Sequence, residues 1–205
     1  MSYAKNKLVN KLVVITGPSA AGKDAVANEV LKWLPLKKVV TTTTRSPRPG
    51  EKRGVDHHFV SRERFKEMIK QDLLLEYVDF DNNYYGTQRQ DLRRPAAAGL
   101  VPLLRVDPME ALRIQRHNPD ALVIFIRPES IQIIKKRLMD RGASIDDIDK
   151  RLRLAKEALA KEHIFAYSIV NKDGYLDETA KTVRRIIKNY LGLSPRCHCE
   201  RSEAI

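Results

Sequence analysis

The chain has few cysteines: only two among 205 residues, Cys197 and Cys199, and both lie in its last nine positions. This excludes a disulfide framework and is typical of a reducing compartment, so we expect a cytoplasmic protein. One histidine stands between the two cysteines, and these three residues do not complete the four ligands of a closed zinc site.

Long apolar segments are also missing. The longest weakly polar stretch, residues 95–104, is interrupted by Gly99 and Pro102, whereas a membrane-spanning helix needs about 20 apolar residues. Residues 1–10 form a basic extension without an apolar stretch, so we expect neither a secretory signal nor a membrane anchor.

Glycine and proline are not abundant either, at nine and ten residues, which excludes a collagen-like chain and a disordered chain rich in these residues. With 42% hydrophobic and 31% charged residues, the composition is typical of a globular protein. At about 100–200 residues per domain, the length predicts one domain with insertions.

Positive charge is in excess, with a formal net charge of +12, which indicates an anionic partner. The arginines and lysines are scattered through the chain and do not form one basic arm with interleaved aromatic residues. We therefore expect phosphorylated small molecules as partners, and neither nucleic acid nor a membrane. The sequence does not indicate an oligomeric state.

Short apolar runs alternate with segments of helical periodicity. Strands are expected at residues 11–16, 39–44, 100–106, 121–126 and 168–170. Helices are expected at residues 24–34 and 109–116, from residue 131 to a break at Gly142, and at residues 148–159 and 178–191. Residues 57–87 predict further short strands, with a helix after Ser61 and a turn at residues 81–83. The pattern predicts an α/β fold with a parallel core sheet and a strand-rich insertion.

A phosphate loop follows the first expected strand. Its sequence, Gly17-Pro-Ser-Ala-Ala-Gly-Lys23-Asp24, fits the pattern G-x-x-x-x-G-K, and it stands between a strand and a helix. The backbone N–H groups of such a loop surround phosphates, and the lysine reaches the β- and γ-phosphates. The expected ATP-binding residues of the loop are Gly17, Pro18, Ser19, Ala20, Ala21, Gly22, Lys23 and Asp24.

Asp24 stands where this pattern usually has serine or threonine. A carboxylate repels a triphosphate unless a cation lies between them, and Mg²⁺ prefers oxygen ligands. Asp24 is therefore a candidate Mg²⁺ ligand, and capping of the following helix is the alternative.

A second anion site is expected at Thr43-Thr-Arg45-Ser-Pro-Arg48-Pro-Gly-Glu51, where two arginines three positions apart flank a proline. Two guanidinium groups at this spacing can bind one phosphate. Two anion sites in one chain indicate phosphoryl transfer between two phosphorylated substrates.

From Lys11 to about Leu191 the chain resembles the guanylate kinase family. The phosphate loop is followed in order by T-T-R-S-P-R-P-G-E, G-V-D-H-H-F-V, N-Y-Y-G-T and I-V-N. The resemblance implies a P-loop three-layer fold and transfer of a phosphoryl group from MgATP to GMP, and also to dGMP. It implies a domain at residues 11–192, with core segments at 11–40, 88–136 and 161–192, a GMP-binding insertion at 41–87 and a lid at 137–160. Residues 193–205 are expected to be a disordered tail.

The resemblance also implies roles for individual residues. Arg45, Arg48 and Tyr85 would bind the GMP phosphate, together with His57, which stands where the family usually has tyrosine. The residues implied to read the guanine are Thr41, Glu76, Thr87 and Asp107. The chemistry agrees, because carboxylates complement the N1–H and N2–H donors of guanine and leave adenine unpaired.

The implied lid supplies three arginines. Arg137 and Arg141 are four positions apart on one expected helix and Arg151 lies on the next, so all three can converge on the transferring phosphoryl group. Asn171 is implied to lie near the adenine of ATP.

Two further departures concern Ala20, which replaces a loop glycine, and Arg105, which replaces the first carboxylate of the family's D-x-D strand end. Because side chains at i and i+2 of a strand share a face, Arg105 is expected beside Asp107. It would either pair with Asp107 and weaken the reading of guanine, or contact a phosphate.

Two other functions stay open. Asp24 and Arg105 favour a ribose 1,5-bisphosphate phosphokinase, an enzyme of the same superfamily. Against it, that enzyme resembles this chain poorly through residues 45–60 and lacks the guanine-reading carboxylates. A non-catalytic guanylate-kinase-like interaction module is less expected, because Lys23, Arg45 and Arg48 are all retained.

Overall fold

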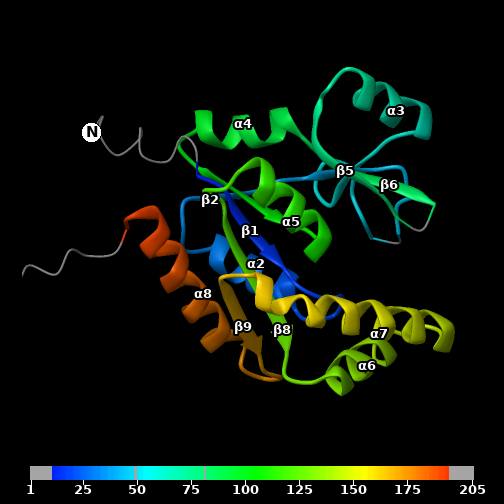
Figure 1. Ribbon diagram of the computed structural model, residues 1–205, viewed down its shortest axis with the longest axis vertical. Coiled ribbons are helices and arrows are strands. Elements are labelled where there is room, and N and C mark those ends of the chain that lie inside the picture. Colours follow the sequence, from blue (N-terminus) through cyan, green and yellow to red (C-terminus); the bar gives the residue numbers. More distant parts are fainter. Residues whose placement is uncertain (1–10, 49, 81, 194–205) are drawn as a thin grey trace, which may run out of the picture.

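The computed structural model describes residues 11–193 except 49 and 81. Its centre is a five-stranded parallel sheet in the order β2-β7-β1-β8-β9 (Figure 1). These strands are β1 (Val13–Thr16), β2 (Leu36–Lys38), β7 (Val101–Arg105), β8 (Leu122–Pro128) and β9 (Tyr167–Asn171). Since all four residues of β1 are buried, the run is apolar on both faces, as a central parallel strand requires.

Helices cover both faces of this sheet. Val13 and Ile15 pack with α2 (Lys23–Leu31) and α8 (Leu176–Leu191), whereas Val14 points to the other face and packs with α5 (Pro108–His117). On that second face Phe165, which follows the short 3₁₀ helix η1 (Glu162–Ile164), stacks on Phe125. The alternation of side chains along β1 thus builds a three-layer α/β core.

A second, smaller sheet with the order β4-β3-β6-β5 lies at one end of the molecule (Figure 1). It contains β3 (Thr41–Thr43), β4 (His57–Phe59), β5 (Leu74–Phe80) and β6 (Asn83–Gln88). Helix α3 (Arg62–Lys70) begins after Ser61, whose Oγ accepts a hydrogen bond from the N–H of Arg64, and it buries Phe65 and Met68 against Leu74. Helix α4 (Arg89–Ala97) leads back to the core.

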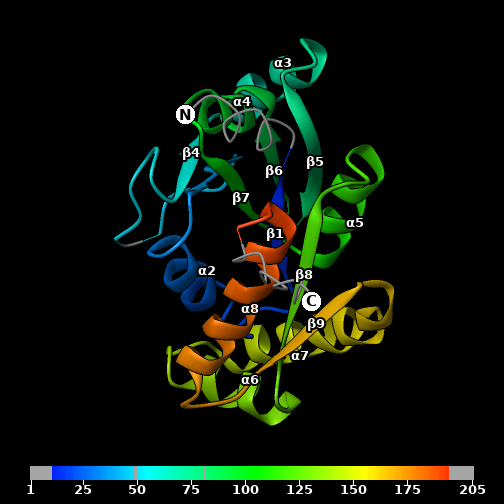
Figure 2. The same ribbon diagram turned by 90° about the vertical axis from the view of Figure 1, so that its left-hand side faces the viewer.

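At the opposite end, α6 (Ile131–Met139) and α7 (Ile145–Ala160) form a helical pair (Figures 1 and 2). The pair has a hydrophobic cluster of its own, built from Ile134, Leu138, Ile148 and Ala155. The core sheet therefore lies between two peripheral units, each with its own small core.

The expected α/β fold with a parallel core sheet is confirmed. Several expected elements are wrong in detail. Helix α2 ends at Leu31 and not at residue 34, because Pro35 follows and residues 32–34 form turns. Strand β2 and helix α4 were not expected; β2 has only three residues, and Pro95 lies inside α4.

Helix α6 ends at Met139, so Arg141 is not on the same helix face as Arg137, contrary to the expectation. The chain turns at Gly142, which has φ of 72°, and the N–H of Gly142 bonds to the carbonyl of Met139. The basic extension and the tail from residue 194 lie outside the described residues. Within the described part of the chain, no helix has the length and apolarity needed to cross a membrane.

Candidate active site

The phosphate loop connects β1 to α2 at the carboxyl end of the core sheet. Gly17 and Gly22 have φ of 134° and 90°, and each leaves no room for a side chain. A Cβ at Gly17 would lie 2.0 Å from the carbonyl oxygen of Ile126, and one at Gly22 would lie 2.2 Å from Nδ2 of Asn171. Ala20 has φ of 59°, so it adopts the left-handed conformation that the glycine it replaces would adopt without strain.

Lys23 folds back over the loop. Its Nζ donates to the carbonyl oxygens of Gly17, at 2.5 Å, and Pro18, at 2.9 Å. Burial lowers the pKa of Lys23 to about 8, an effect that Asp107 opposes and Arg105 reinforces. The ammonium is thus enclosed by carbonyl oxygens at the place where phosphate oxygens would bind.

Side chains from three other elements contact the same loop. The amide of Asn171 donates to the carbonyl of Ala21 at 2.9 Å, and Arg137 Nη1 donates to the carbonyl of Ala20 at 3.1 Å. Arg151 Nη1 donates to Ser19 Oγ at 3.1 Å. Helices α6 and α7 therefore already bring two arginines to the phosphate loop, whereas Arg141 is exposed beyond the end of α6.

Both arginines also have acidic partners. Arg137 Nη2 bonds to Asp173 at 2.9 Å, which lowers the pKa of that carboxyl group, and Arg151 Nε bonds to Asp147 at 2.8 Å. Asn171 is only 4% exposed, and its position against the loop backbone makes it a support of the loop.

Asp24 does not cap α2. The N-cap position is Gly22, and the Asp24 carboxylate forms an ion pair with Arg105 at the carboxyl end of β7. Of the two alternatives for Arg105, the pairing with Asp107 is therefore wrong, because the guanidinium pairs with Asp24 on α2.

The surroundings of Asp24 suit a Mg²⁺ ion that takes most of its ligands from a nucleotide. The Asp24 side chain is 67% exposed, and the described residues contain no cluster of three or more acidic, histidine or cysteine side chains that could hold a metal. Mg²⁺ typically uses one or two carboxylates together with substrate phosphates and water. A single accessible carboxylate beside a phosphate loop fits that mode.

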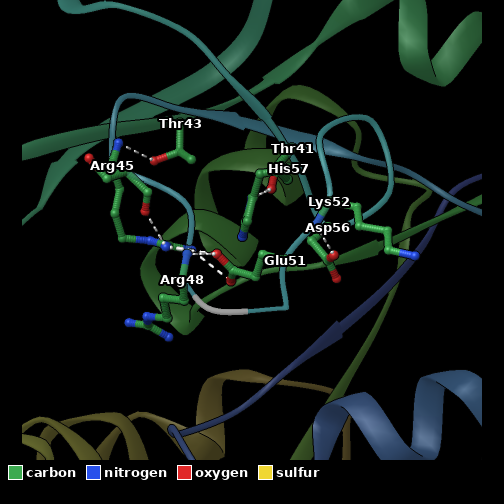
Figure 3. A network of polar contacts seen from close by, with 9 residues as sticks. Thr41, Thr43, Arg45, Arg48, Glu51, Lys52, Asp56 and His57 are labelled. Atoms are coloured by element: carbon green, nitrogen blue, oxygen red, sulfur yellow. Dashed lines mark hydrogen bonds and ion pairs between the residues drawn. The ribbon is translucent and has the colours of Figure 1, made fainter.

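The arginine loop, residues 43–51, is organised by Glu51 (Figure 3). The two oxygens of Glu51 accept from Nη1 and Nη2 of Arg45, both at 2.9 Å, and one also accepts from the backbone N–H of Arg48 at 2.7 Å. Hydrogen bonding from Arg45 lowers the pKa of Glu51 to about 2. Arg45 is therefore held in place, while the exposed side chain of Arg48 extends away from Glu51 (Figure 3).

His57 and Thr41 lie beside this loop on neighbouring strands. Thr41 Oγ1 and His57 Nδ1 are 2.9 Å apart and share a hydrogen bond. Burial lowers the pKa of His57, with Arg45 as a further cause, so its ring is neutral at physiological pH. The ring of Tyr85 meets His57 edge-on, with centroids 6.4 Å apart.

Glu76 is buried in the second sheet with only half of its carboxylate paired. Thr87 Oγ1 donates to Oε1 at 2.7 Å, and Oε2 has no hydrogen-bond partner among the described residues. Burial raises the pKa of Glu76. A buried oxygen of this kind is costly without a donor, so a ligand that supplies N–H or O–H groups would be stabilised there.

Glu110 is an acidic residue that the sequence reasoning missed. Asp107 is the N-cap residue of α5, and the Glu110 carboxylate accepts a hydrogen bond from the Asp107 N–H at 3.1 Å. Burial, together with the nearby charges of Glu76 and Asp107, raises the pKa of Glu110 to about 8. The spacing D-x-x-E before an apolar helix is a capping-box signal that could have identified it.

Comparisons with known proteins agree with this arrangement. Residues 9–190 match the family model described as guanylate kinase. The guanylate kinase of Prochlorococcus marinus subsp. pastoris is 37% identical over 189 residues, covering 89% of this chain and all of that protein. The guanylate kinase of Thermus thermophilus is 39% identical over 162 residues, covering 78% of this chain and 74% of that protein.

The solved structures include a similar protein. The crystal structure of guanylate kinase from Anaplasma phagocytophilum superimposes with a TM-score of 0.71 at 28% identity, covering 89% of this chain and 86% of that one. The family model spans most of the chain, and both curated relatives exceed 30% identity over more than three quarters of it. The chain therefore belongs to the guanylate kinase family.

Proposed function

We propose that this chain transfers the γ-phosphoryl group of ATP to GMP, giving ADP and GDP. Membership of the guanylate kinase family carries the overall reaction, ATP-dependent phosphorylation of GMP. The observation that carries the choice of acceptor is the buried Glu76 carboxylate, with one oxygen bonded to Thr87 and the other unpaired in the described structure.

Guanine supplies what Glu76 lacks. Its N1–H and N2–H groups are adjacent donors, whereas adenine presents an acceptor at N1. The charges of Asp107 and Glu110 both raise the pKa of Lys23, and that of Glu76 raises the pKa of Glu110, so these carboxyl groups lie between the Glu76 pocket and the phosphate loop. In this proposal Glu76 and Asp107 read the base, and Thr41 and Thr87 contribute hydroxyl groups.

The phosphates are bound by cations on separate elements. Lys23 and the backbone of residues 17–24 bind the ATP phosphates, while Arg45, Arg48, Tyr85 and His57 bind the phosphate of GMP. Arg137, Arg141 and Arg151 neutralise the charge that spreads over the transferring group. Positioning and charge neutralisation then supply the catalysis, with no covalent enzyme intermediate.

Asp24 would hold Mg²⁺ together with the ATP phosphates. Bound there, the ion neutralises charge on the β- and γ-phosphates. The Asp24 carboxylate is accessible to this ion, since 67% of the side chain is exposed.

The two peripheral units have distinct roles in this proposal. Residues 41–87 form the GMP-binding insertion, and residues 137–160 form a lid whose arginines close on the nucleotide. Residues 11–40, 88–136 and 161–192 form the core. The reducing cytoplasm is the proposed compartment, on the basis of the two cysteines alone.

A ribose 1,5-bisphosphate acceptor is disfavoured by charge. Its second phosphate would enter a pocket that holds Glu76 and Asp107, whose charges already raise the pKa of Glu110, and a phosphate dianion is repelled by carboxylates. The observation in its favour is Arg105, but Asp24 already offsets that charge.

The test is an ADP-release assay with MgATP and, in separate reactions, GMP, dGMP, AMP and ribose 1,5-bisphosphate. We expect GMP to be the best acceptor, AMP far poorer and ribose 1,5-bisphosphate negligible. Faster turnover of ribose 1,5-bisphosphate than of GMP contradicts the proposal, and no turnover of any acceptor favours the non-catalytic module.

A further inference from the structure

Two unusual residues of this chain, 81 positions apart, meet in the structure. Asp24 occupies the phosphate-loop position that usually carries a hydroxyl group. Arg105 occupies the strand-end position where the resemblance to the family predicts a carboxylate. Strand β7 lies parallel to β1 with Arg105 opposite Ile15, two residues before Gly17. This register brings the Arg105 guanidinium to the first turn of α2, where it pairs with the Asp24 carboxylate.

Arg105 is also a neighbour of Lys23. Burial lowers the pKa of Arg105, and the charge of Arg105 contributes to lowering the pKa of Lys23. The Arg105 side chain is 28% exposed, whereas that of Asp24 is 67% exposed. The partner of Arg105, the Asp24 carboxylate, is thus mostly exposed to solvent, and an exposed ion pair of this kind contributes little stability.

We propose that Arg105 is a phosphate-binding residue of the ATP site and that Asp24 competes with the phosphates for it. This inference rests on the proposed function, in that a triphosphate binds the phosphate loop. In the nucleotide-free protein Asp24 holds the guanidinium. When a triphosphate binds, its oxygens replace the Asp24 carboxylate on Arg105, which leaves that carboxylate free to ligate Mg²⁺.

The alternative is a purely structural ion pair that joins α2 to β7. The two accounts differ in what removal of Asp24 does to phosphate binding without metal. If Asp24 competes for Arg105, its neutralisation strengthens binding, and only while Arg105 is present. A structural ion pair gives no such dependence of one substitution on the other.

The experiment is a double-mutant cycle on the full chain. Binding of tripolyphosphate is measured calorimetrically in EDTA for the wild type, Arg105→Met, Asp24→Asn and the double variant. We expect Arg105→Met to weaken binding about 10- to 100-fold, as for loss of a charge-assisted hydrogen bond. Asp24→Asn should strengthen it severalfold, and the double variant should bind like Arg105→Met.

Two further variants keep the cycle interpretable. Arg116→Met removes the same charge from an exposed position of α5 and should leave binding unchanged, which separates contact from net charge. Arg105→Lys retains the charge but lacks the planar guanidinium group with its several N–H donors, and this variant should bind tripolyphosphate with intermediate affinity. If thermal unfolding shows that Arg105→Met does not fold, the cycle is run with Arg105→Lys.

Unchanged binding in Arg105→Met overturns the proposal. The proposal is also overturned if Asp24→Asn strengthens tripolyphosphate binding equally when Arg105 is replaced by methionine. That gain in affinity would come only from the loss of repulsion between the Asp24 carboxylate and the phosphates. The cycle needs no acceptor, so a wild type that binds tripolyphosphate through Arg105 but does not phosphorylate GMP refutes the proposed function alone.

Discussion

Replacement of Glu76 by glutamine tests the reading of guanine with a minimal change of shape. In the structure Oε1 accepts from Thr87 at 2.7 Å, and the buried Oε2 has no partner among the described residues. Glutamine can keep the bond to Thr87 through its carbonyl oxygen. Its NH₂ group then occupies the place of Oε2, so a donor replaces an acceptor.

The loss can be worked out from hydrogen-bond energies. A bond to a charged group contributes about 1.5–3 kcal/mol, and a buried donor left facing another donor costs about 1–3 kcal/mol more. At about 1.4 kcal/mol per factor of ten, we expect kcat/KM for GMP to fall about 10²- to 10⁴-fold. AMP presents an acceptor at N1, which the NH₂ of glutamine can satisfy, so kcat/KM for AMP should be unchanged or higher.

Stability should move in the opposite direction from activity. Burial raises the pKa of Glu76, so at neutral pH the ionised carboxylate is less favourable in the folded chain than in the unfolded chain. This penalty shrinks as the pH falls and the group is protonated. Glu76→Gln removes it, so Tm at pH 7 should be equal to or higher than that of the wild type.

The assay is ADP release with GMP and with AMP, together with thermal unfolding of each variant. Glu67→Gln on α3 is the matched control, because that side chain is 58% exposed and pairs only with Arg64 in the described structure; its activity should not change. Equal losses with GMP and AMP in Glu76→Gln would refute the reasoning, because the residue would then support the fold without reading the base.

Three further predictions concern the phosphate loop. Gly17→Ala places a Cβ 2.0 Å from a backbone oxygen, so it should lower Tm and abolish ATP binding. Its control is Gly174→Ala, where φ is also positive but a Cβ meets nothing within 4 Å, and this variant should lower Tm only slightly. Similar effects in both variants would contradict the steric argument. Since the pKa of Lys23 is about 8, kcat/KM for ATP should fall as the pH rises through 8 and the ammonium loses its proton. The pKa of Glu110 is also about 8, so Glu110→Gln is the control, and it should retain this fall of kcat/KM above pH 8. If the fall disappears in Glu110→Gln, it is caused by Glu110 and not by Lys23. Asp24→Ala should raise the Mg²⁺ concentration needed for activity and Asp24→Ser should recover much of it; wild-type Mg²⁺ dependence in both would exclude ligation.

The parts of the site that are local in sequence could be predicted from it. The phosphate loop needs only a strand, two glycines that take positive φ, a lysine and a helix, and all lie within residues 13–31. The arginine loop is equally local, since Arg45 and Glu51 are six positions apart. The sequence did not reveal that Glu51 binds Arg45, because spacing alone does not say which way a loop side chain turns.

Contacts that depend on strand register could not be predicted in this way. The pairing of Arg105 with Asp24 follows from the alignment of β7 beside β1, and the effect of Glu76 on the pKa of Glu110 follows from the packing of α5 near the second sheet. The end of α6 was missed for a different reason. The apolar periodicity continues to Leu138, but Gly142 ends the helix before it reaches Arg141.

Most cations of the site are paired with protein oxygens before any phosphate arrives. Lys23 contacts loop carbonyls, Arg45 pairs with Glu51, and Arg105 pairs with Asp24. Because an unpaired buried charge is costly, these partners keep the ligand-free site stable. If these cations bind phosphate as proposed, binding is an exchange of oxygens, and its net affinity is smaller than the sum of the new contacts. At Arg45 and Arg105 the exchange would also release a carboxylate, that of Glu51 and that of Asp24, so these two ion pairs would be part of the response of the site to substrate.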